Sequence, residues 1–196
     1  MTINKKMLFS VFGSPIAHSL SPLIHQDFAH QFNLPLTYTK TLSTSSEFLS
    51  ILTQLKNNHD LIGANITAPL KQFVFNLCDK VLPRAKLVQS VNTIYWDQNN
   101  NLFGDNTDGI GFECDIYINH KQHFEDQNIL LIGAGGAAAG ILPFILKHQP
   151  RAIYIYNRTQ QRAESLCHRF NMLQSELSLN ILNTSTQIKF DWVINT

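Results

Sequence analysis

Short apolar runs alternate along the chain with longer amphipathic segments. Such runs predict strands, and the amphipathic segments between them predict helices. The strands that we expect cover Met7–Phe12, Leu36–Leu42, Leu61–Thr67, Val91–Trp96, Asn128–Ile132, Ala152–Tyr156 and Asp191–Asn195, with a weaker one near Leu179–Leu182. The helices that we expect cover Ser21–Phe32, Thr44–Lys56, about Asp79–Val88 and Asp108–Asn119.

Two of these helices carry start signals. Ser19 or Ser21 is suited to cap the first helix, and Pro22 suits its first turn, where the missing N–H would have no partner anyway. Thr44 is followed three residues later by Glu47, which is the pattern of a capping box.

The regular alternation indicates an α/β protein with mostly parallel sheets. We expect two domains, residues 1–107 and residues 108–196, with the helix that begins at Asp108 linking them. A chain of 196 residues with a net charge of +1 and 44% hydrophobic residues is typical of a soluble globular protein. The near-neutral charge gives no support for a nucleic-acid partner.

The positions of the cysteines and histidines indicate whether the chain has disulfides or a metal site. The three cysteines have no CxxC spacing, and the eight histidines show no metal-ligand pattern, so we expect reduced thiols and no metal site. The segment Met1–Gly13 holds too short an apolar run for a signal peptide. We therefore expect a cytoplasmic protein.

A glycine-rich turn stands between a strand and a helix in the second domain. Gly133, Gly135 and Gly136 directly follow the strand Asn128–Ile132. Glycines there let a pyrophosphate approach the free N–H groups of the next helix, as in a Rossmann domain. We expect the backbone from Gly133 to Ala137, which includes Ala134, to bind a dinucleotide.

The end of the next strand indicates which dinucleotide. Asn157 follows Gly133 by 24 residues, close to the spacing of roughly 20 at which an acidic residue binds the ribose of NAD. Here the acidic residue is absent, and Asn157, Arg158 and Thr159 are followed by Arg162. A guanidinium pairs with a 2′-phosphate, so we expect NADP.

The same region has one competing interpretation. The run from Ile129 to Leu146 contains no charged residue and is long enough for a membrane span. It divides, however, into a β-rich and an alanine-rich half at the glycine turn, and Pro143 interrupts it. We therefore expect no membrane-spanning segment.

Polar residues in the first domain gather at predicted strand ends and loops. They are Ser19 and Ser21, then Asn65, Thr67 and Lys71, then Asn92, and finally the run GDNTDG, which contains Asp105 and Asp108. Each has an ordinary interpretation by itself: serines cap helices, most lysines are solvated, and Asp105 suits a turn. At the carboxyl ends of parallel strands, however, such groups are typical of ligand sites.

Taken together and in this order, the motifs FGSPIAHSLSP, GANITAPLK, VNT, GDNTDG, GAGGAAAG and NRT resemble the shikimate dehydrogenase family. The resemblance implies NADPH-dependent, reversible reduction of 3-dehydroshikimate to shikimate in aromatic amino-acid biosynthesis. It implies that Ser19 and Ser21 hold the substrate carboxylate and that Lys71 and Asp108 form the catalytic pair. The residues implied to bind the substrate hydroxyls are Asn65, Thr67, Asn92 and Asp108.

The sequence departs from the family pattern in two places. The family commonly has an arginine shortly after the glycine turn, where this chain has Ala138, Ala139 and Gly140. The chain also stops at Thr196, before further strands and helices of the family, so we expect a partial Rossmann domain with exposed apolar surface around Trp192, Val193 and Ile194.

Two other functions stay open. One is an NAD-using quinate/shikimate dehydrogenase, which Arg158 argues against. The other is a catalytically silent module that binds only substrate or nucleotide. A domain like that of glutamyl-tRNA reductase shares the glycine turn, but it leaves GDNTDG and GANITAPLK unexplained. The sequence leaves the oligomeric state open, with a homodimer as one option.

Overall fold

The computed structural model describes residues 7–171, 179–182 and 187–196. The chain forms two compact units, Met1–Asn106 and Thr107–Thr196. The predicted boundary at residues 107 and 108, and the roles given to the two domains, remain predictions. Residues 1–6, on which the expectation about a signal peptide partly rests, lie outside the described residues.

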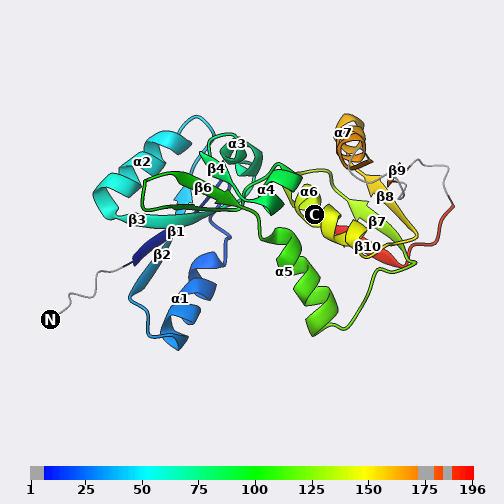
Figure 1. Cartoon of the computed structure of the whole chain (residues 1–196), viewed down its shortest axis with the longest axis horizontal. Helices are drawn as coiled ribbons and strands as arrows, with labels where there is room; N and C mark the ends of the chain where they lie inside the picture. The colour runs from blue at the N-terminus through cyan, green and yellow to red at the C-terminus, as the bar shows by residue number, and fades with distance from the viewer. Residues whose placement is uncertain (1–6, 172–178, 183–186) are drawn as a thin grey trace. The chain divides into compact units, whose positions relative to one another are not determined.

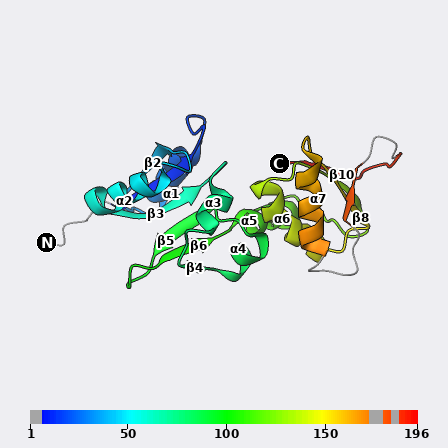
Figure 2. The ribbon, with the colours of Figure 1, turned by 90° about the horizontal axis from the view of Figure 1, so that it is seen from above.

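The first unit is built on a six-stranded sheet in the order β2-β1-β3-β5-β6-β4. Strand β1 is parallel to its two neighbours, β2 and β3. Strand β5 lies between β3 and β6 and runs antiparallel to both (Figure 2). The α/β class predicted from the sequence is therefore confirmed. The strands are β1 (Met7–Gly13), β2 (Leu36–Leu42), β3 (Leu61–Ile66), β4 (Lys80–Val81), β5 (Thr93–Trp96) and β6 (Leu102–Asp105).

Helices cover both faces of this sheet, with α1 on one side and α2 on the other (Figure 1). The alternation of side chains along β1 explains the two layers, because Phe12 joins the cluster around Phe48 and Leu52 of α2, whereas Val11 packs with Tyr38 on the opposite face. The helices are α1 (Ser21–Gln31), α2 (Phe48–His59), α3 (Lys71–Phe75) and α4 (Pro83–Val88).

The helix predicted over Asp79–Val88 was wrong in its first half. Lys80–Val81 pairs with β6 as a short parallel strand, and the helix begins only at Pro83. The Asp79 carboxylate accepts a hydrogen bond from the Leu102 N–H at 2.7 Å, which ties this segment to β6. Proline favours the first helical position because it has no N–H to leave unpaired.

The predicted helix caps also need correction. Leu20 is the N-cap of α1, without a side-chain capping bond, and Ser21 is the first helical residue. Helix α2 begins at Phe48, later than predicted, because the segment after Thr44 first forms a turn. In that turn the Thr44 hydroxyl donates to Glu47 Oε2 at 2.7 Å.

The second unit contains a parallel four-stranded sheet in the order β10-β7-β8-β9. Its connections from β7 to β8 and from β8 to β9 step in one direction, which places α6 and α7 on one face of the sheet. The strands are β7 (Asn128–Ile132), β8 (Ala152–Tyr156), β9 (Leu179–Ile181) and β10 (Trp192–Asn195), and the helices are α5 (Asp108–Cys114), which continues as a π-helical turn over Asp115–Asn119, α6 (Gly136–Lys147) and α7 (Gln160–Asn171).

The core of the second unit lies between this sheet and its helices. Alternate residues of β7 and β8 are fully buried against apolar residues of α6 and α7. Trp192 and Ile194 also pack against this cluster, with the Trp192 and Phe124 ring centroids 5.1 Å apart. The expectation of an exposed apolar surface there holds fully only for Val193, which is 60% exposed.

The apolar run from Ile129 to Leu146 is divided between strand β7 and helix α6, with the glycine turn between them. Among the residues that the structure describes, no helix combines the length and apolar character needed to cross a bilayer.

Candidate active site

The carboxyl ends of β1 and β3 lie side by side in the first unit and continue into paired loops. The Thr67 N–H donates to the Phe12 carbonyl at 2.9 Å, and the Ser14 N–H donates to the Ala68 carbonyl at 3.1 Å. The Ile66 N–H donates to the Asn92 carbonyl at 2.8 Å. These backbone bonds bring Thr67 and Asn92, two predicted substrate-binding residues, to the same end of the sheet.

Asn65 lies at this same end, and its side chain is held by three hydrogen bonds. Its Nδ2 donates to the Asn92 carbonyl at 3.3 Å and to Thr93 Oγ1 at 3.2 Å. Its Oδ1 accepts from the Tyr38 hydroxyl at 2.5 Å. Thr93 in turn donates to Asn92 Oδ1 at 2.9 Å, so the two asparagines belong to one network.

Ser19 and Ser21 stand at the start of α1, and both are partly buried. Ser19 Oγ accepts from the Ser21 N–H at 3.3 Å and donates to Ser21 Oγ at 3.2 Å. Sequence reasoning missed the hydrogen bond between Tyr38 and Asn65, because a buried tyrosine in an alternating strand is typical of an ordinary core residue.

Lys71 is the first residue of α3 and is half-buried. Its backbone carbonyl accepts from the Val91 N–H at 3.0 Å. This bond fixes the start of α3 beside the segment that delivers Asn92. Asp108 belongs to the other unit, where it is the first residue of α5.

A second network fixes the last residues of the first unit. Asp105 is 6% exposed and receives hydrogen bonds from Arg84, including one from Nε to Oδ1 at 2.6 Å. This bond lowers the pKa of the Asp105 carboxyl, against the opposing effect of burial. The Asn106 amide donates to the Ser90 carbonyl at 3.0 Å. No motif in the sequence indicated that Arg84 binds the Asp105 carboxylate.

The glycine turn of the second unit lies between β7 and α6. Gly133 has φ of +112°, and a Cβ there would come within 2.3 Å of Thr196 Oγ1. A Cβ on Gly135, by contrast, would meet nothing within 4 Å. The turn is therefore closed on the Gly133 side and open at Gly135, directly before the N-terminus of a twelve-residue helix.

The end of β8 lies against this turn. Asn157 Oδ1 accepts from the Ala134 N–H at 3.2 Å, and Asn157 Nδ2 donates to the Thr159 carbonyl at 2.7 Å. Arg158 and Arg162 are both exposed. Ala138 and Ala139, where the family commonly has an arginine, are buried in the core, at 0% and 1% exposed.

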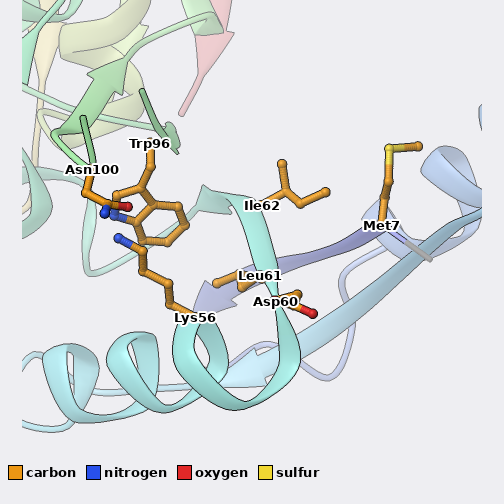
Figure 3. Close-up of a pocket in the computed structure, with 7 residues that line it drawn as sticks. All are labelled: Met7, Lys56, Asp60, Leu61, Ile62, Trp96 and Asn100. Atoms are coloured by element: carbon orange, nitrogen blue, oxygen red, sulfur yellow. The ribbon is translucent and has the colours of Figure 1, made fainter. Parts of the chain in front are cut away.

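A separate hollow of about 410 Å³ lies elsewhere on the first unit (Figure 3). It is lined by residues at the amino ends of β1 and β3, among them Met7 and Leu61, together with Trp96 at the end of antiparallel β5. The Lys56 ammonium lies 4.5 Å from the centre of the Trp96 ring. This hollow is at the opposite end of the strands from Asn65 and Thr67.

Comparison with known proteins identifies the family. Residues 11–94 match the family described as "Shikimate dehydrogenase substrate binding domain", and residues 117–195 match "Shikimate / quinate 5-dehydrogenase". The chain is 41% identical over 188 residues to the shikimate dehydrogenase (NADP(+)) of Shewanella woodyi, covering 96% of this chain and 67% of that protein. The chain belongs to the shikimate dehydrogenase family. The resemblance noted from the sequence motifs is thereby confirmed.

The chain is also similar to two further members of the shikimate dehydrogenase family, one compared by sequence and one by structure. It is 44% identical over 167 residues to the enzyme of Hydrogenovibrio crunogenus, covering 83% of this chain and 59% of that protein. It superimposes with a TM-score of 0.81 on the crystal structure of shikimate 5-dehydrogenase from Thermus thermophilus in complex with NADP(H) and shikimate, at 27% identity, covering 96% of this chain and 67% of that one. The chain thus spans 59% to 67% of the length of these relatives.

Proposed function

We propose that the chain carries out the NADPH-dependent, reversible reduction of 3-dehydroshikimate to shikimate. The observation that carries the proposal is the gathering of Asn65, Thr67 and Asn92 at one end of the first unit's sheet, in a chain with NADP-dependent shikimate dehydrogenases as relatives. The relative from Thermus thermophilus binds both NADP(H) and shikimate.

The polar residues at the start of α1 and at the carboxyl ends of the strands are the proposed substrate ligands. The Ser19 and Ser21 hydroxyls donate hydrogen bonds to the substrate carboxylate. Asn65, Thr67 and Asn92 bind the substrate hydroxyls, with Asp108 from the second unit. Hydroxyl and amide groups can both donate and accept, which suits a ligand whose hydroxyls do the same.

Lys71 and Asp108 form the proposed catalytic pair. Reduction of the ketone places negative charge on its oxygen, so a proton donor must lie within hydrogen-bonding reach. The Lys71 ammonium stabilises that charge and gives up the proton that completes the hydroxyl, and it regains a proton from water. Asp108 orients the ammonium and a substrate hydroxyl.

The second unit is the proposed nucleotide-binding part. Bound NADPH would supply the hydride, and the protein's share is to position it. The open space at Gly135 fits a pyrophosphate on the N-terminus of α6, held by the backbone of Gly133 to Ala137. Arg158, Thr159 and Arg162 bind the 2′-phosphate, with Asn157 beside them.

We also propose that the chain acts in aromatic amino-acid biosynthesis, is located in the cytoplasm, and binds small molecules rather than nucleic acids. Family membership supports the first. A homodimer is a further proposal, which sedimentation velocity tests through the mass of the sedimenting species.

The test is the reduction of NADP⁺ by shikimate, followed at the absorbance of NADPH. We expect turnover by the wild type and a loss in kcat of about 10²–10⁴ for Lys71→Ala, with NADPH binding retained. Faster turnover with NAD⁺ and quinate would favour the quinate/shikimate alternative. Saturable binding of both ligands without turnover would favour the silent binding module.

A further inference from the structure

The segment Ser90–Asn92 carries a proposed substrate ligand, Asn92, to the start of β5. The Val91 N–H donates to the Lys71 carbonyl at 3.0 Å, and the Asn92 N–H donates to the Asp105 carbonyl at 2.9 Å. The segment therefore lies between the start of α3, where the proposed proton donor Lys71 stands, and the end of β6. A shift of this segment would displace Asn92 and loosen its tie to the start of α3.

The side chain of Asn106 gives this segment a further hydrogen bond. Asn106 Nδ2 donates to the Ser90 carbonyl at 3.0 Å. A carbonyl can only accept, so Asn106 must turn its NH₂ group toward Ser90. Asn106 is 2% exposed and Ser90 is 0% exposed. Removal of the amide would therefore leave a buried carbonyl without this donor, which is costly for the local structure.

The position of Asn106 is itself fixed by a buried ion pair. The Asn106 N–H donates to Asp105 Oδ1 at 2.7 Å. Arg84 Nε donates to the same oxygen at 2.6 Å, and Arg84 Nη2 donates to Asp105 Oδ2. A bidentate pair of this kind holds a carboxylate in one orientation. Arg84 thus orients Asp105, Asp105 orients Asn106, and Asn106 holds Ser90.

We propose that Asn106 is a positioning residue whose side-chain amide holds the segment Ser90–Asn92, and through it Asn92 and the start of α3, in place for the substrate. The inference rests on the proposed function, which assigns a substrate hydroxyl to Asn92 and the proton transfer to Lys71. It adds a role for the first asparagine of the GDNTDG motif, which acts through Asn92 and Lys71 from a buried position.

The first variant is Asn106→Ala, which removes the amide. We expect the protection of the Val91 and Asn92 N–H groups against hydrogen exchange to fall at least about tenfold more than that of the β1 and β2 amides. The Kd for shikimate should rise about tenfold, and the Kd for NADP⁺ should stay unchanged. An equal fall in protection across the first unit would show general destabilisation and would overturn the inference.

Asn101→Ala is the matched control. Asn101 lies in the turn between β5 and β6, at the opposite end of these two strands from Asn92 and Asp105. Its side-chain amide donates to Asp97 Oδ2 at 2.8 Å. This variant also loses an amide hydrogen bond in the first unit, but it should leave the protection of Val91 and the Kd for shikimate unchanged.

The second variant, Asn106→Asp, keeps the size of the side chain and makes its donor depend on pH. An ionised carboxylate cannot donate to the Ser90 carbonyl, whereas a protonated carboxyl can. Burial and the neighbouring Asp105 carboxylate should raise the pKa of the introduced carboxyl, and the Arg84 guanidinium, which is already paired with Asp105, opposes this only in part.

We therefore expect Asn106→Asp to resemble Asn106→Ala at about pH 8 and to approach the wild type at about pH 5. The measured quantities are the Kd for shikimate and the protection of Val91 and Asn92, each divided by the wild-type value at the same pH. Ratios that do not change with pH overturn the inference, because a side chain that only fills space would give that result.

Hydrogen exchange also separates this inference from the proposed function. Unchanged protection of Val91 and Asn92 in Asn106→Ala overturns the inference whether or not the chain is active. A wild type that neither binds nor oxidises shikimate, with the protection falling in Asn106→Ala as expected, contradicts the proposed function and leaves the structural role of Asn106 in place.

Discussion

Asn157 holds the glycine turn through a hydrogen bond from the Ala134 N–H to Asn157 Oδ1, at 3.2 Å. Its Nδ2 is bonded to the Thr159 carbonyl at 2.7 Å. The spacing in the sequence pointed to Asn157 as a ligand of the 2′-phosphate, and that role stays a prediction. In the structure the Asn157 side chain has a structural role that does not depend on a bound nucleotide, because its hydrogen bonds connect the glycine turn to the end of β8.

This arrangement predicts different effects for two neighbouring residues. Asn157→Ala should loosen the turn, and we expect the Kd for NADPH and for NADH to rise together, each about tenfold. Titration of the intrinsic nucleotide fluorescence measures both. An effect on NADPH alone would contradict the structural task and favour direct contact with the phosphate. Gln161→Ala, at an exposed position of α7, is the control.

Arg158→Ala should act on one nucleotide only. Removing a guanidinium that pairs with a phosphate costs about 1.5–3 kcal/mol, so we expect the Kd for NADPH to rise at least tenfold and that for NADH to stay near its wild-type value. Arg151→Ala is the matched control. Arg151 is also exposed, but it lies directly before the first residue of β8, away from the glycine turn, and pairs with Asp126. Equal weakening of both nucleotides by Arg158→Ala would contradict the assignment of NADP.

The Arg84–Asp105 pair predicts a pH-dependent loss of stability. Arg84→Gln leaves the 6% exposed carboxylate of Asp105 without its guanidinium, and we expect the free energy of unfolding at pH 7 to fall by about 1–3 kcal/mol. Because the pKa of Asp105 is lowered in the folded state, the pair stabilises fully above the unfolded pKa.

The difference between wild type and Arg84→Gln should therefore shrink as the pH falls below about 4, toward the lowered folded pKa of Asp105. Urea unfolding of both proteins between pH 7 and pH 3 measures it. A difference that stays constant over this range would show that the charge of Asp105 does not contribute. Arg151→Gln, which breaks an exposed ion pair, should change stability much less than Arg84→Gln does at pH 7.

Two glycines of α5 should respond to alanine with opposite signs. A Cβ on Gly109 would lie 2.0 Å from the Phe144 ring of α6, whereas a Cβ on Gly111 would meet nothing within 4 Å. We expect Gly109→Ala to lower the free energy of unfolding by about 1–3 kcal/mol through overpacking. Gly111→Ala should raise it by about 0.5–1 kcal/mol through helix propensity. Thermal unfolding of the two variants tests the packing of α5 on α6, and effects of the same sign would contradict it.

Much of the fold could be predicted where the local pattern and the tertiary structure agree. The strand Ala152–Tyr156 was predicted at its observed bounds, because a buried parallel strand has an apolar signature of its own. The strand Lys80–Val81 could not be found, because two residues carry no periodicity and their pairing with β6 is a long-range contact. Strand β6 was missed for a different reason, because its four residues include a glycine and are too few to show a clear alternation.

The candidate site shows a similar limit. Motifs pointed to residues with polar groups at strand ends, such as Asn65, because those groups stand out against apolar neighbours. Tyr38 and Arg84 could not be found in this way, because each acts through a partner more than twenty residues away in the chain. The sequence thus indicates which groups are available for chemistry, and the structure shows what holds them.

The central claim is that this chain transfers a hydride between shikimate and NADP⁺. Shikimate carrying deuterium on the carbinol carbon that becomes the ketone of 3-dehydroshikimate tests it most directly. We predict that the wild type moves the deuterium to the nicotinamide ring of NADPH, detected by mass spectrometry, and that Lys71→Ala does so about 10²–10⁴ times more slowly. NADPH formed without the label, or no transfer while both ligands are bound, would contradict the account.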